Sequence, residues 1–249
     1  MTSYERDGFC VFDADPRVLK WAKAAKNYAR AVVNDEHLRE RWLRHQNTWF
    51  VGIDVLPNEW DGSIAGVPFA GPWHSLVTPP ERWHKAQVSV VYKGYPKQDI
   101  SESDANHKFR IKRCAAHVDG ILLEDGRRYL REPHSFVLGM PLGCSRASPL
   151  VVWPGSHIAM GNALRAAISD KDPNMVDLTD AYKTARAQVF EQIEPIEVHA
   201  YIGQSMLLHR HLLHGVAPWK KTDTVPPEGR MIAYFRPKSN ESNAWLINQ

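Results

Sequence analysis

Eight short β-rich segments follow one another between residues 48 and 237, separated by Gly, Pro, Asn and Asp. Regularly spaced short strands with turn residues between them favour an antiparallel sandwich or barrel over alternating strand–helix units. The sequence therefore predicts a mainly β core over residues 48–237. The segments are 48–56, 86–92, 109–118, 135–142, 149–153, 193–202, 205–214 and 230–237.

Two other parts of the chain have helical periodicity. Residues 15–45 begin with Asp15, a residue type that caps helices, and Pro16, which is favoured at the first helical position. Residues 161–192 place apolar side chains at helical spacing between two of the predicted strands. We therefore expect one domain over residues 1–249, with a helical N-terminal part at 15–45 and a helical insertion at 161–192 in the β core.

Charge and cysteine content exclude several classes of protein. The chain has 31 Lys and Arg against 28 Asp and Glu, a net charge of +3, which is too weak a bias for a nucleic-acid or polybasic membrane-binding protein. Its 3 cysteines match no zinc or redox signature, and no stretch of 18 apolar residues occurs. We expect a cytoplasmic protein that acts on a small molecule and binds neither nucleic acid nor a membrane.

The 12 histidines raise the expectation of a metal site, and two clusters of them could form one. His117-Val118-Asp119 ends the segment 109–118, and residues i and i+2 of an extended chain face the same side. Three more histidines, His209, His211 and His214, lie within six residues among apolar neighbours. Because a strand would turn His214 away from the other two, we expect this cluster to supply one ligand.

A His-x-Asp pair joined to one distant histidine forms the two-histidine, one-carboxylate triad. That triad is typical of non-haem Fe(II) oxygenases and leaves coordination positions open. A structural zinc site is normally closed by four ligands, often cysteines, and no cysteine pair is available here.

The order of these residues resembles the phytanoyl-CoA dioxygenase family of Fe(II)/2-oxoglutarate-dependent oxygenases over about residues 86–237. The resemblance implies a double-stranded β-helix core of the jelly-roll, cupin-like type. It also implies that His117, Asp119 and His214 bind iron and that Arg230 binds the distal carboxylate of 2-oxoglutarate. The residues that carry it are His117-Val118-Asp119, Val151-Val152-Trp153-Pro154-Gly155-Ser156-His157, Gly203, His209, Leu213-His214-Gly215 and Arg230.

Several neighbouring residues have two interpretations. Arg230 suits a carboxylate because its guanidinium forms a fixed fork, and Arg236, on the same face by period two, is the reserve candidate. By the resemblance, His209 either contacts the cosubstrate or is a hydrogen-bonded core histidine. We interpret His157 as structural and the basic segment 126–131 as a solvated loop. Trp60, Trp73 and Trp83, in the long loop 56–85, either line a substrate pocket or pack a lid onto the sheet.

The resemblance implies a dioxygenase that uses Fe(II), O2 and 2-oxoglutarate to hydroxylate a small-molecule substrate, with release of succinate and CO2. Two alternatives use the same scaffold, because fold alone does not determine function. One is a cupin-type metal-dependent hydrolase or isomerase with Zn, Mn or Ni. The other is a non-catalytic protein that binds a small molecule.

Overall fold

The computed structural model describes residues 1–143, 146–220, 228–239 and 245. Its α-helices are α1 (Ser3–Asp7), α2 (Pro16–Asn34), α3 (Glu36–Trp42), α4 (Asp104–Arg113), α5 (Ser156–Ile168) and α6 (Thr179–Gln192), with short 3-10 turns η1 (Pro72–Ser75) and η2 (Pro173–Met175). Its strands are β1 (Phe9–Phe12), β2 (Leu43–Arg44), β3 (Trp49–Gly52), β4 (Gln87–Val91), β5 (Ile121–Glu124), β6 (Arg127–Leu130), β7 (Phe136–Pro141), β8 (Leu150–Val152), β9 (Ile196–Val198), β10 (Ser205–His209), β11 (His214–Val216) and β12 (Arg230–Phe235).

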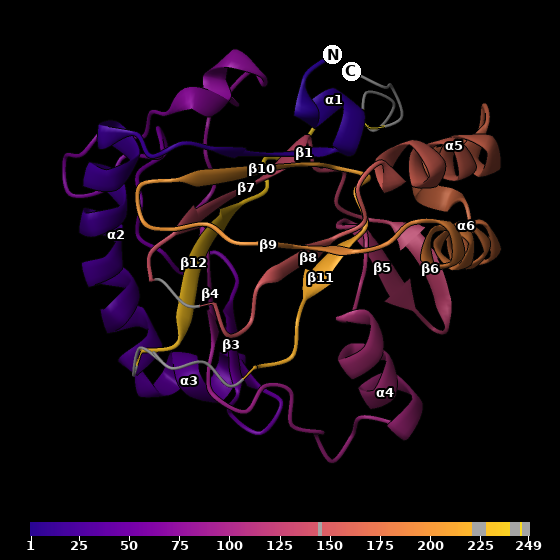
Figure 1. Ribbon diagram of the computed structural model, residues 1–249, viewed down its shortest axis with the longest axis horizontal. Coiled ribbons are helices and arrows are strands. Elements are labelled where there is room, and N and C mark those ends of the chain that lie inside the picture. The colour runs from indigo at the N-terminus through magenta and orange to yellow at the C-terminus, as the bar shows by residue number, and fades with distance from the viewer. Residues whose placement is uncertain (144–145, 221–227, 240–244, 246–249) are drawn as a thin grey trace.

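The strands form a large sheet, a small sheet and a separate hairpin, all with antiparallel pairing. The large sheet has the order β1-β10-β7-β12-β4-β3-β2, the small sheet has the order β11-β8-β9, and β5 pairs with β6. Figure 1 shows the strands at the centre of the molecule, with α2 on one side and α5 and α6 on the other. The expected mainly β architecture of jelly-roll type is confirmed.

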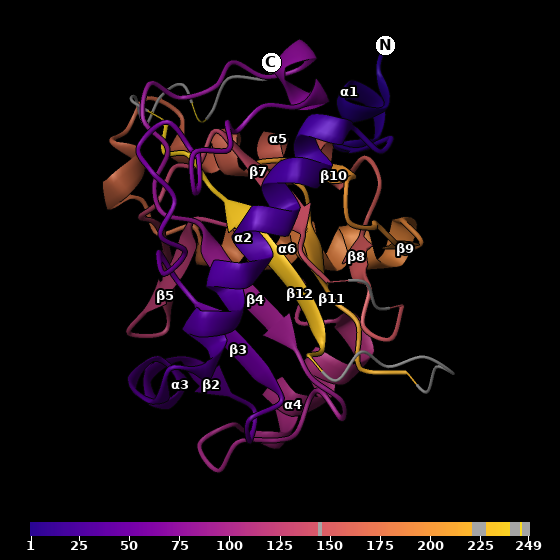
Figure 2. The ribbon, with the colours of Figure 1, turned by 90° about the vertical axis from the view of Figure 1, so that its left-hand side faces the viewer.

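Helix α2 covers the outer face of the large sheet (Figure 2). Asp15 caps it by accepting a hydrogen bond from the backbone N–H of Arg17 at 2.8 Å, and Pro16 is its first residue, as expected. Its buried side chains, among them Val18 and Trp21, share one hydrophobic cluster with Phe235 and other residues of the sheet. The apolar stripe of the N-terminal helical part therefore packs into the hydrophobic core on the outer face of the large sheet.

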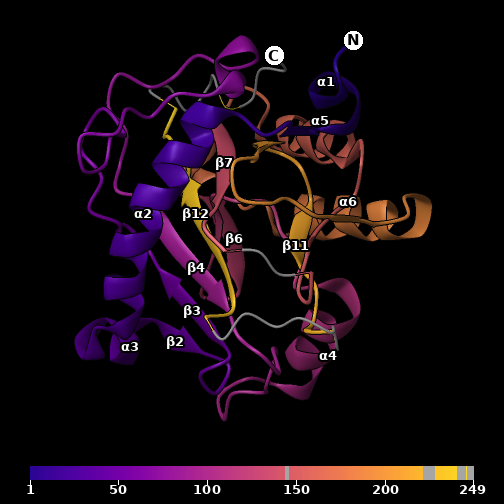
Figure 3. The same cartoon turned by 60° about the vertical axis from the view of Figure 1, so that its left-hand side comes forward.

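The inner face of the large sheet packs against the small sheet, and Figure 3 shows β11 standing opposite β4, β7 and β12. Alternation along β12 separates the two faces, because Met231 and Ala233 pack toward α2 whereas Ile232 and Tyr234 join the cluster between the sheets. By the same period of two, Arg230 and Arg236 face the space between the sheets.

The predicted helical insertion is confirmed and begins earlier, at Ser156, where α5 starts. Helices α5 and α6 cover the outer face of the small sheet, and Trp153, Leu164 and Tyr182 lie in the same buried cluster there. The molecule thus has four layers, with α2, the large sheet, the small sheet and the α5–α6 pair stacked in that order.

The prediction of a strand over residues 109–118 is wrong, because most of that segment belongs to helix α4. The Ser103 side chain accepts a hydrogen bond from the backbone N–H of Asn106 and caps the helix. Asp104 in the first turn and Arg113 in the last turn match the helix dipole. No side chain of α4 is buried. The alternation of apolar and polar residues in this segment therefore does not reflect one buried and one exposed face of a strand.

Two further assignments change. The predicted strand 205–214 is two strands, because the chain turns after His209 and crosses from β10 in the large sheet to β11 in the small sheet. The segment 126–131 is not a loop but contains β6, joined to β5 through Asp125 and Gly126 at φ 48° and 80°. Asp-Gly with two positive φ angles is typical of a tight hairpin turn.

The large sheet also extends beyond the predicted core, through β1 near the N-terminus and through β2. Part of the chain between β11 and β12 lies outside the described residues, which omit 221–227. None of the helices in the described ranges is long and apolar enough to span a lipid bilayer.

Candidate metal centre

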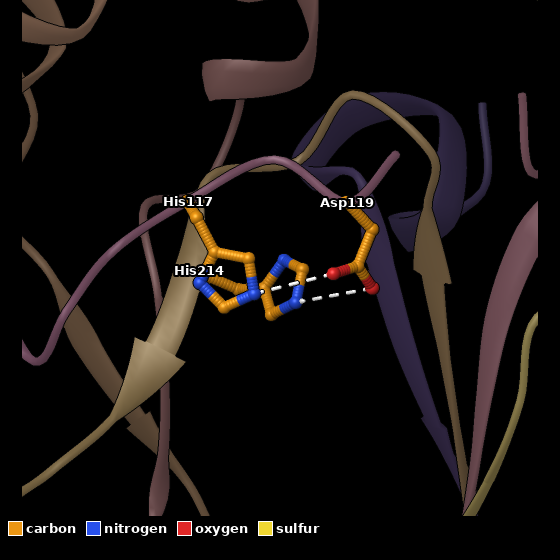
Figure 4. A group of neighbouring side chains, drawn as sticks. All are labelled: His117, Asp119 and His214. Carbon is orange, nitrogen blue, oxygen red and sulfur yellow. Dashed lines mark ion pairs between the residues drawn. The ribbon is translucent and has the colours of Figure 1, made fainter. Parts of the chain in front are cut away.

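His117, Asp119 and His214 come together at one end of the space between the sheets (Figure 4). Their potential ligand atoms all lie within 4.8 Å of one another. The His117 Nε2 atom is 3.2 Å from Asp119 Oδ1, and the His214 Nε2 atom is 3.7 Å from Asp119 Oδ2. Metal bonds of roughly 2.1 Å at right angles would separate two ligand atoms by about 3 Å, so the observed spacing suits one face of a metal ion.

Backbone pairing holds the two histidines side by side. The His117 N–H donates to the carbonyl oxygen of His214 at 2.8 Å, and the His214 N–H donates back at 3.1 Å. His214 opens β11 opposite Val152, whose side chain belongs to the cluster between the sheets, so the imidazole faces inward. The extended backbone expected around His117 is therefore present as a bridge to β11, although the segment before it is helical.

The second ring nitrogen of each histidine is already occupied. The Nδ1 atoms of His117 and His214 lie 3.0 and 2.9 Å from the carbonyl oxygens of Ala115 and Leu212. A carbonyl oxygen only accepts hydrogen bonds, so Nδ1 carries the proton and Nε2 presents its lone pair to the centre. Burial lowers the pKa of His214 to about 4, which keeps that imidazole neutral at pH 7. The donor set therefore fits a divalent metal.

Asp119 is held as a carboxylate by its neighbours. Burial alone would raise its pKa, but the charge of Arg236 holds the pKa well below its usual value. Arg236 Nε donates to Asp119 Oδ2 at 2.7 Å, and its Nη1 donates to the side-chain oxygen of Gln87. Oδ2 is thus engaged, and Oδ1 stays available as a ligand beside His117.

A glycine follows each of the two deeply placed ligands, and both positions need one. A Cβ atom on Gly120 would lie 2.0 Å from the carbonyl oxygen of Glu132, and the residue has a φ of +84°. A Cβ atom on Gly215 would lie 2.1 Å from the carbonyl oxygen of Cys114. These close approaches bring the Asp119 and His214 backbones against the neighbouring chain segments.

Gly215→Ala is expected to destabilise the protein by about 1–3 kcal/mol, the usual cost of overpacking, and to weaken metal binding. The added methyl group must push β11 away from the segment that carries His117. Urea unfolding and titration with Co2+ measure the two effects. Gly143→Ala is the control, because a Cβ atom there would have no neighbour closer than 3.4 Å. Equal losses in both variants would contradict the assignment.

The triad stands in the wall of a cavity of about 1150 Å³. Apolar and aromatic side chains line much of it, among them Trp49, Trp83, Ile121 and Phe136. Such a mixture of an apolar wall with a few charged groups is typical of small-molecule sites.

The three tryptophans of the loop 56–85 have different surroundings. Trp83 lines the cavity, and Trp73 is fully buried in the core on the α2 side. Trp60 is 58% exposed and packs under the guanidinium of Arg82. The loop therefore supplies one cavity wall residue and one core residue from the three.

Arg230 faces the space between the sheets but does not line the cavity. It lies at the far end of β12 from Arg236, and six residues of extended chain separate their Cα atoms by about 20 Å. Its side chain is 5% exposed, and its buried Nη1 atom has no hydrogen-bond partner in the described part of the chain. Arg236, the reserve candidate, is the arginine that the structure brings to the triad.

The structure does not bring His209 to the triad. On β10 it shares the face of Leu207, which packs toward α2, and not the face of Met206 and Leu208 between the sheets. Its ring contacts His157 and Tyr4 at centroid distances of 4.8 and 5.9 Å. This placement favours a core histidine and gives no support to a cosubstrate contact. His157 is also buried in this cluster, in agreement with a structural role.

The His209 cluster predicts a pH dependence of stability. Burial, followed by the charges of His157 and Arg210, lowers the pKa of His209 to about 3, whereas an unfolded histidine titrates near 6.5. Between these values the unfolded chain binds a proton that the folded protein does not, so stability falls as the pH drops below about 6.5. His209→Asn is expected to remove about 2 kcal/mol of the loss between pH 7 and pH 5.

Urea unfolding at the two pH values measures this effect. The asparagine oxygen can still accept the His211 N–H, which His209 Nδ1 accepts at 3.1 Å. His37→Asn, at an exposed position on α3, is the matched control. An unchanged pH dependence in His209→Asn would contradict the prediction.

Sequence reasoning missed Gln87 and Tyr182 and held Arg236 only in reserve. Period two from Arg230 pointed to Arg236, but nothing in the sequence pairs it with Asp119 across 117 positions. Tyr182 accepts a hydrogen bond from the Val118 N–H at 3.1 Å and so fixes the residue between two ligands from the helical insertion. No local pattern predicts that contact.

Comparison with protein-family models gives no match, and comparison with curated proteins gives none. Among solved structures, EctD from S. alaskensis with bound Fe is 16% identical, with a TM-score of 0.44 over 94% of this chain and 73% of that chain. The non-haem α-ketoglutarate-dependent carbocyclase SnoK from nogalamycin biosynthesis is 14% identical, with a TM-score of 0.49 over 99% and 88%. AviO1 from Streptomyces viridochromogenes is 15% identical, with a TM-score of 0.36 over 94% and 91%.

Structural similarity at these identities and TM-scores does not show which activity this chain has. The chain's own layers and side chains define a jelly-roll protein with a two-histidine, one-carboxylate group at the wall of a large cavity.

Proposed function

We propose that the chain is an Fe(II)- and 2-oxoglutarate-dependent dioxygenase that hydroxylates a small-molecule substrate and releases succinate and CO2. The observation that supports this most is the convergence of two unprotonated imidazole Nε2 atoms and one carboxylate oxygen on a large cavity. Three protein ligands on one side of a metal leave positions free for a cosubstrate and oxygen. Iron bound there would supply the oxidation itself.

In this proposal the protein's residues bind the metal, orient its ligands and shield the substrate from water. His117, Asp119 and His214 hold the metal, and Arg236 keeps Asp119 ionised and oriented. The aromatic walls at Trp49 and Trp83 exclude water around the substrate.

We further propose that Arg230 binds the distal carboxylate of 2-oxoglutarate. Its buried Nη1 atom lacks a partner within the described residues, and it faces the same space between the sheets as Arg236. A buried guanidinium without a partner carries a free-energy cost that a ligand carboxylate would offset.

An anaerobic titration of the metal-free protein with Fe(II) and then 2-oxoglutarate tests the proposal without knowledge of the substrate. A weak charge-transfer absorption in the visible range is expected when both are bound. Admission of air should then yield succinate in amounts that scale with enzyme. Binding of 2-oxoglutarate at a hundred times its dissociation constant should also raise the free energy of unfolding by roughly 2.7 kcal/mol.

The same experiment separates the alternatives. Tight binding of Zn, Mn or Ni without any stabilisation by 2-oxoglutarate would favour a cupin-type hydrolase or isomerase. Failure to bind any divalent metal would sink both enzymatic proposals and leave a small-molecule-binding protein.

A further inference from the structure

A second hollow of about 360 Å³ lies beside the metal centre. Residues of α4, β6 and α6 form its walls together with residues 115–117. It shares Arg110, Ala115 and His117 with the large cavity, so the two spaces meet at a metal ligand.

The acidic residues in this hollow already have partners. Glu102 accepts a hydrogen bond from Arg110 Nε at 2.9 Å and lies 3.2 Å from His107 Nδ1. Asp99 accepts from the backbone N–H groups of His45 and Gln46, both at 2.8 Å. Both carboxylates thus engage groups on their own side of the hollow, and neither pairs with an arginine of the far wall.

Two arginines on the far wall pair with no carboxylate among the described residues. The guanidinium carbons of Arg128 and Arg186 lie 4.7 and 5.2 Å from the centre of the same Tyr182 ring. Within the described ranges the neighbouring arginines Arg127 and Arg131 form the ion pairs on this side, and the buried Nε of Arg128 has no hydrogen-bond partner. Burial lowers the pKa of Arg186; Tyr182, which hydrogen-bonds its guanidinium, opposes this shift, and the charge of Arg128 adds to it. Two partly buried guanidinium groups therefore line one hollow, and neither is paired with a carboxylate among the described residues.

We propose that this hollow binds an oxyanion group, a phosphate or a carboxylate, between Arg128 and Arg186. The planar guanidinium fork matches both groups and binds them through two hydrogen bonds. The site is independent of the dioxygenase activity proposed above. Because the hollow opens onto His117, an anion there can belong to a molecule whose body lies in the large cavity. Tyr182 also holds the Val118 N–H at 3.1 Å, so the same ring underlies the anion site and supports the metal-ligand segment.

Calorimetric titration of the metal-free protein with inorganic phosphate, at ionic strength matched with chloride, tests the site. One saturable site is expected, and Arg128→Gln and Arg186→Gln should each weaken it by about tenfold or more. Arg127→Gln is the matched control, because this substitution removes the same charge from the neighbouring position on β6. Arg127 is exposed, and its Nε atom lies 3.6 Å from Asp177 Oδ2. Equal affinity in all four proteins, or no saturable binding to the parent, would overturn the proposal.

Two additions guard the result. Arg128→Lys keeps the positive charge but loses the planar guanidinium fork, and it can be measured if a glutamine variant fails to fold. A loss of phosphate affinity in the lysine variant supports the site, and an unchanged affinity opposes it. Titration with a short alkyl phosphate identifies the source: tighter binding than inorganic phosphate assigns the group to a larger molecule, and equal binding assigns it to the free ion. His214→Ala should leave phosphate affinity unchanged, which separates this site from the metal centre.

Discussion

Asp119→Ala is expected to weaken metal binding by more than about 100-fold, beyond the range seen when only a residue behind a ligand is changed. The variant loses one of three ligand groups and the negative charge that balances the metal. It also leaves the Arg236 guanidinium, which donates to Asp119 at 2.7 Å, without its acceptor. Breaking a buried ion pair from one side costs roughly 3–5 kcal/mol, so a lower free energy of unfolding is expected as well.

Asp119→Asn separates the two effects. Asparagine keeps the size and can still accept the Arg236 hydrogen bond but does not restore the negative charge, so part of the stability should return while metal affinity stays low. Co2+ titration and urea unfolding are the measurements, and both are needed. Asp54→Asn, at a carboxylate on the cavity rim that is 59% exposed and pairs with His84, is the control for a lost charge. Undiminished metal binding in Asp119→Ala would remove the basis of the proposed function.

Arg230→Gln is expected to weaken 2-oxoglutarate binding by about 10–100-fold, the worth of a hydrogen-bonded charge pair of roughly 1.5–3 kcal/mol. Metal affinity should not change, because Arg230 lies at the other end of β12 from the triad. Arg236→Gln should behave in the opposite way and weaken metal binding by about 10–100-fold through Asp119.

The comparison of the two variants is decisive because each serves as the control for the other. Metal affinity is measured by Co2+ titration, and cosubstrate affinity by the charge-transfer absorption at saturating Fe(II). Loss of 2-oxoglutarate binding in Arg236→Gln alone would move the carboxylate site to Arg236. Loss of neither affinity in Arg230→Gln would make Arg230 a buried structural residue.

The sequence predicted those parts of the fold whose local pattern and tertiary environment agree. Asp15 and Pro16 mark the start of α2, and β4, β7, β8 and β12 are short apolar runs that the structure places in sheets. The segment 109–118 failed because α4 is an exposed helix, so no buried stripe marks its period. The prediction of one strand over 205–214 failed because the segment is apolar throughout, and the turn at which the chain passes from one sheet to the other leaves no mark in that pattern.

In the candidate site, too, the sequence predicted the features that lie close together along the chain and missed the contacts that depend on the tertiary fold. His117 and Asp119 are neighbours in sequence, and the family resemblance singled out His214 among three histidines. The pairing of Asp119 with Arg236 and the support of Val118 by Tyr182 depend on which strands and helices meet. Contacts of that kind lie beyond local periodicity. The resemblance gave His209 two interpretations, and the structure places it on β10, a strand that ends before His214, where its surroundings favour the core histidine.

Strand β1 occupies the edge of the large sheet next to β10, with Phe9 to Phe12 paired to Leu208 to Ser205. Removal of the first twelve residues would expose the hydrogen-bonding groups of β10, an apolar strand able to pair with another molecule. We expect such a truncated protein to form aggregates that light scattering detects, whereas the intact chain does not. The N-terminal segment thus covers the hydrogen-bonding edge of β10, and shortened versions made for crystallisation should retain it.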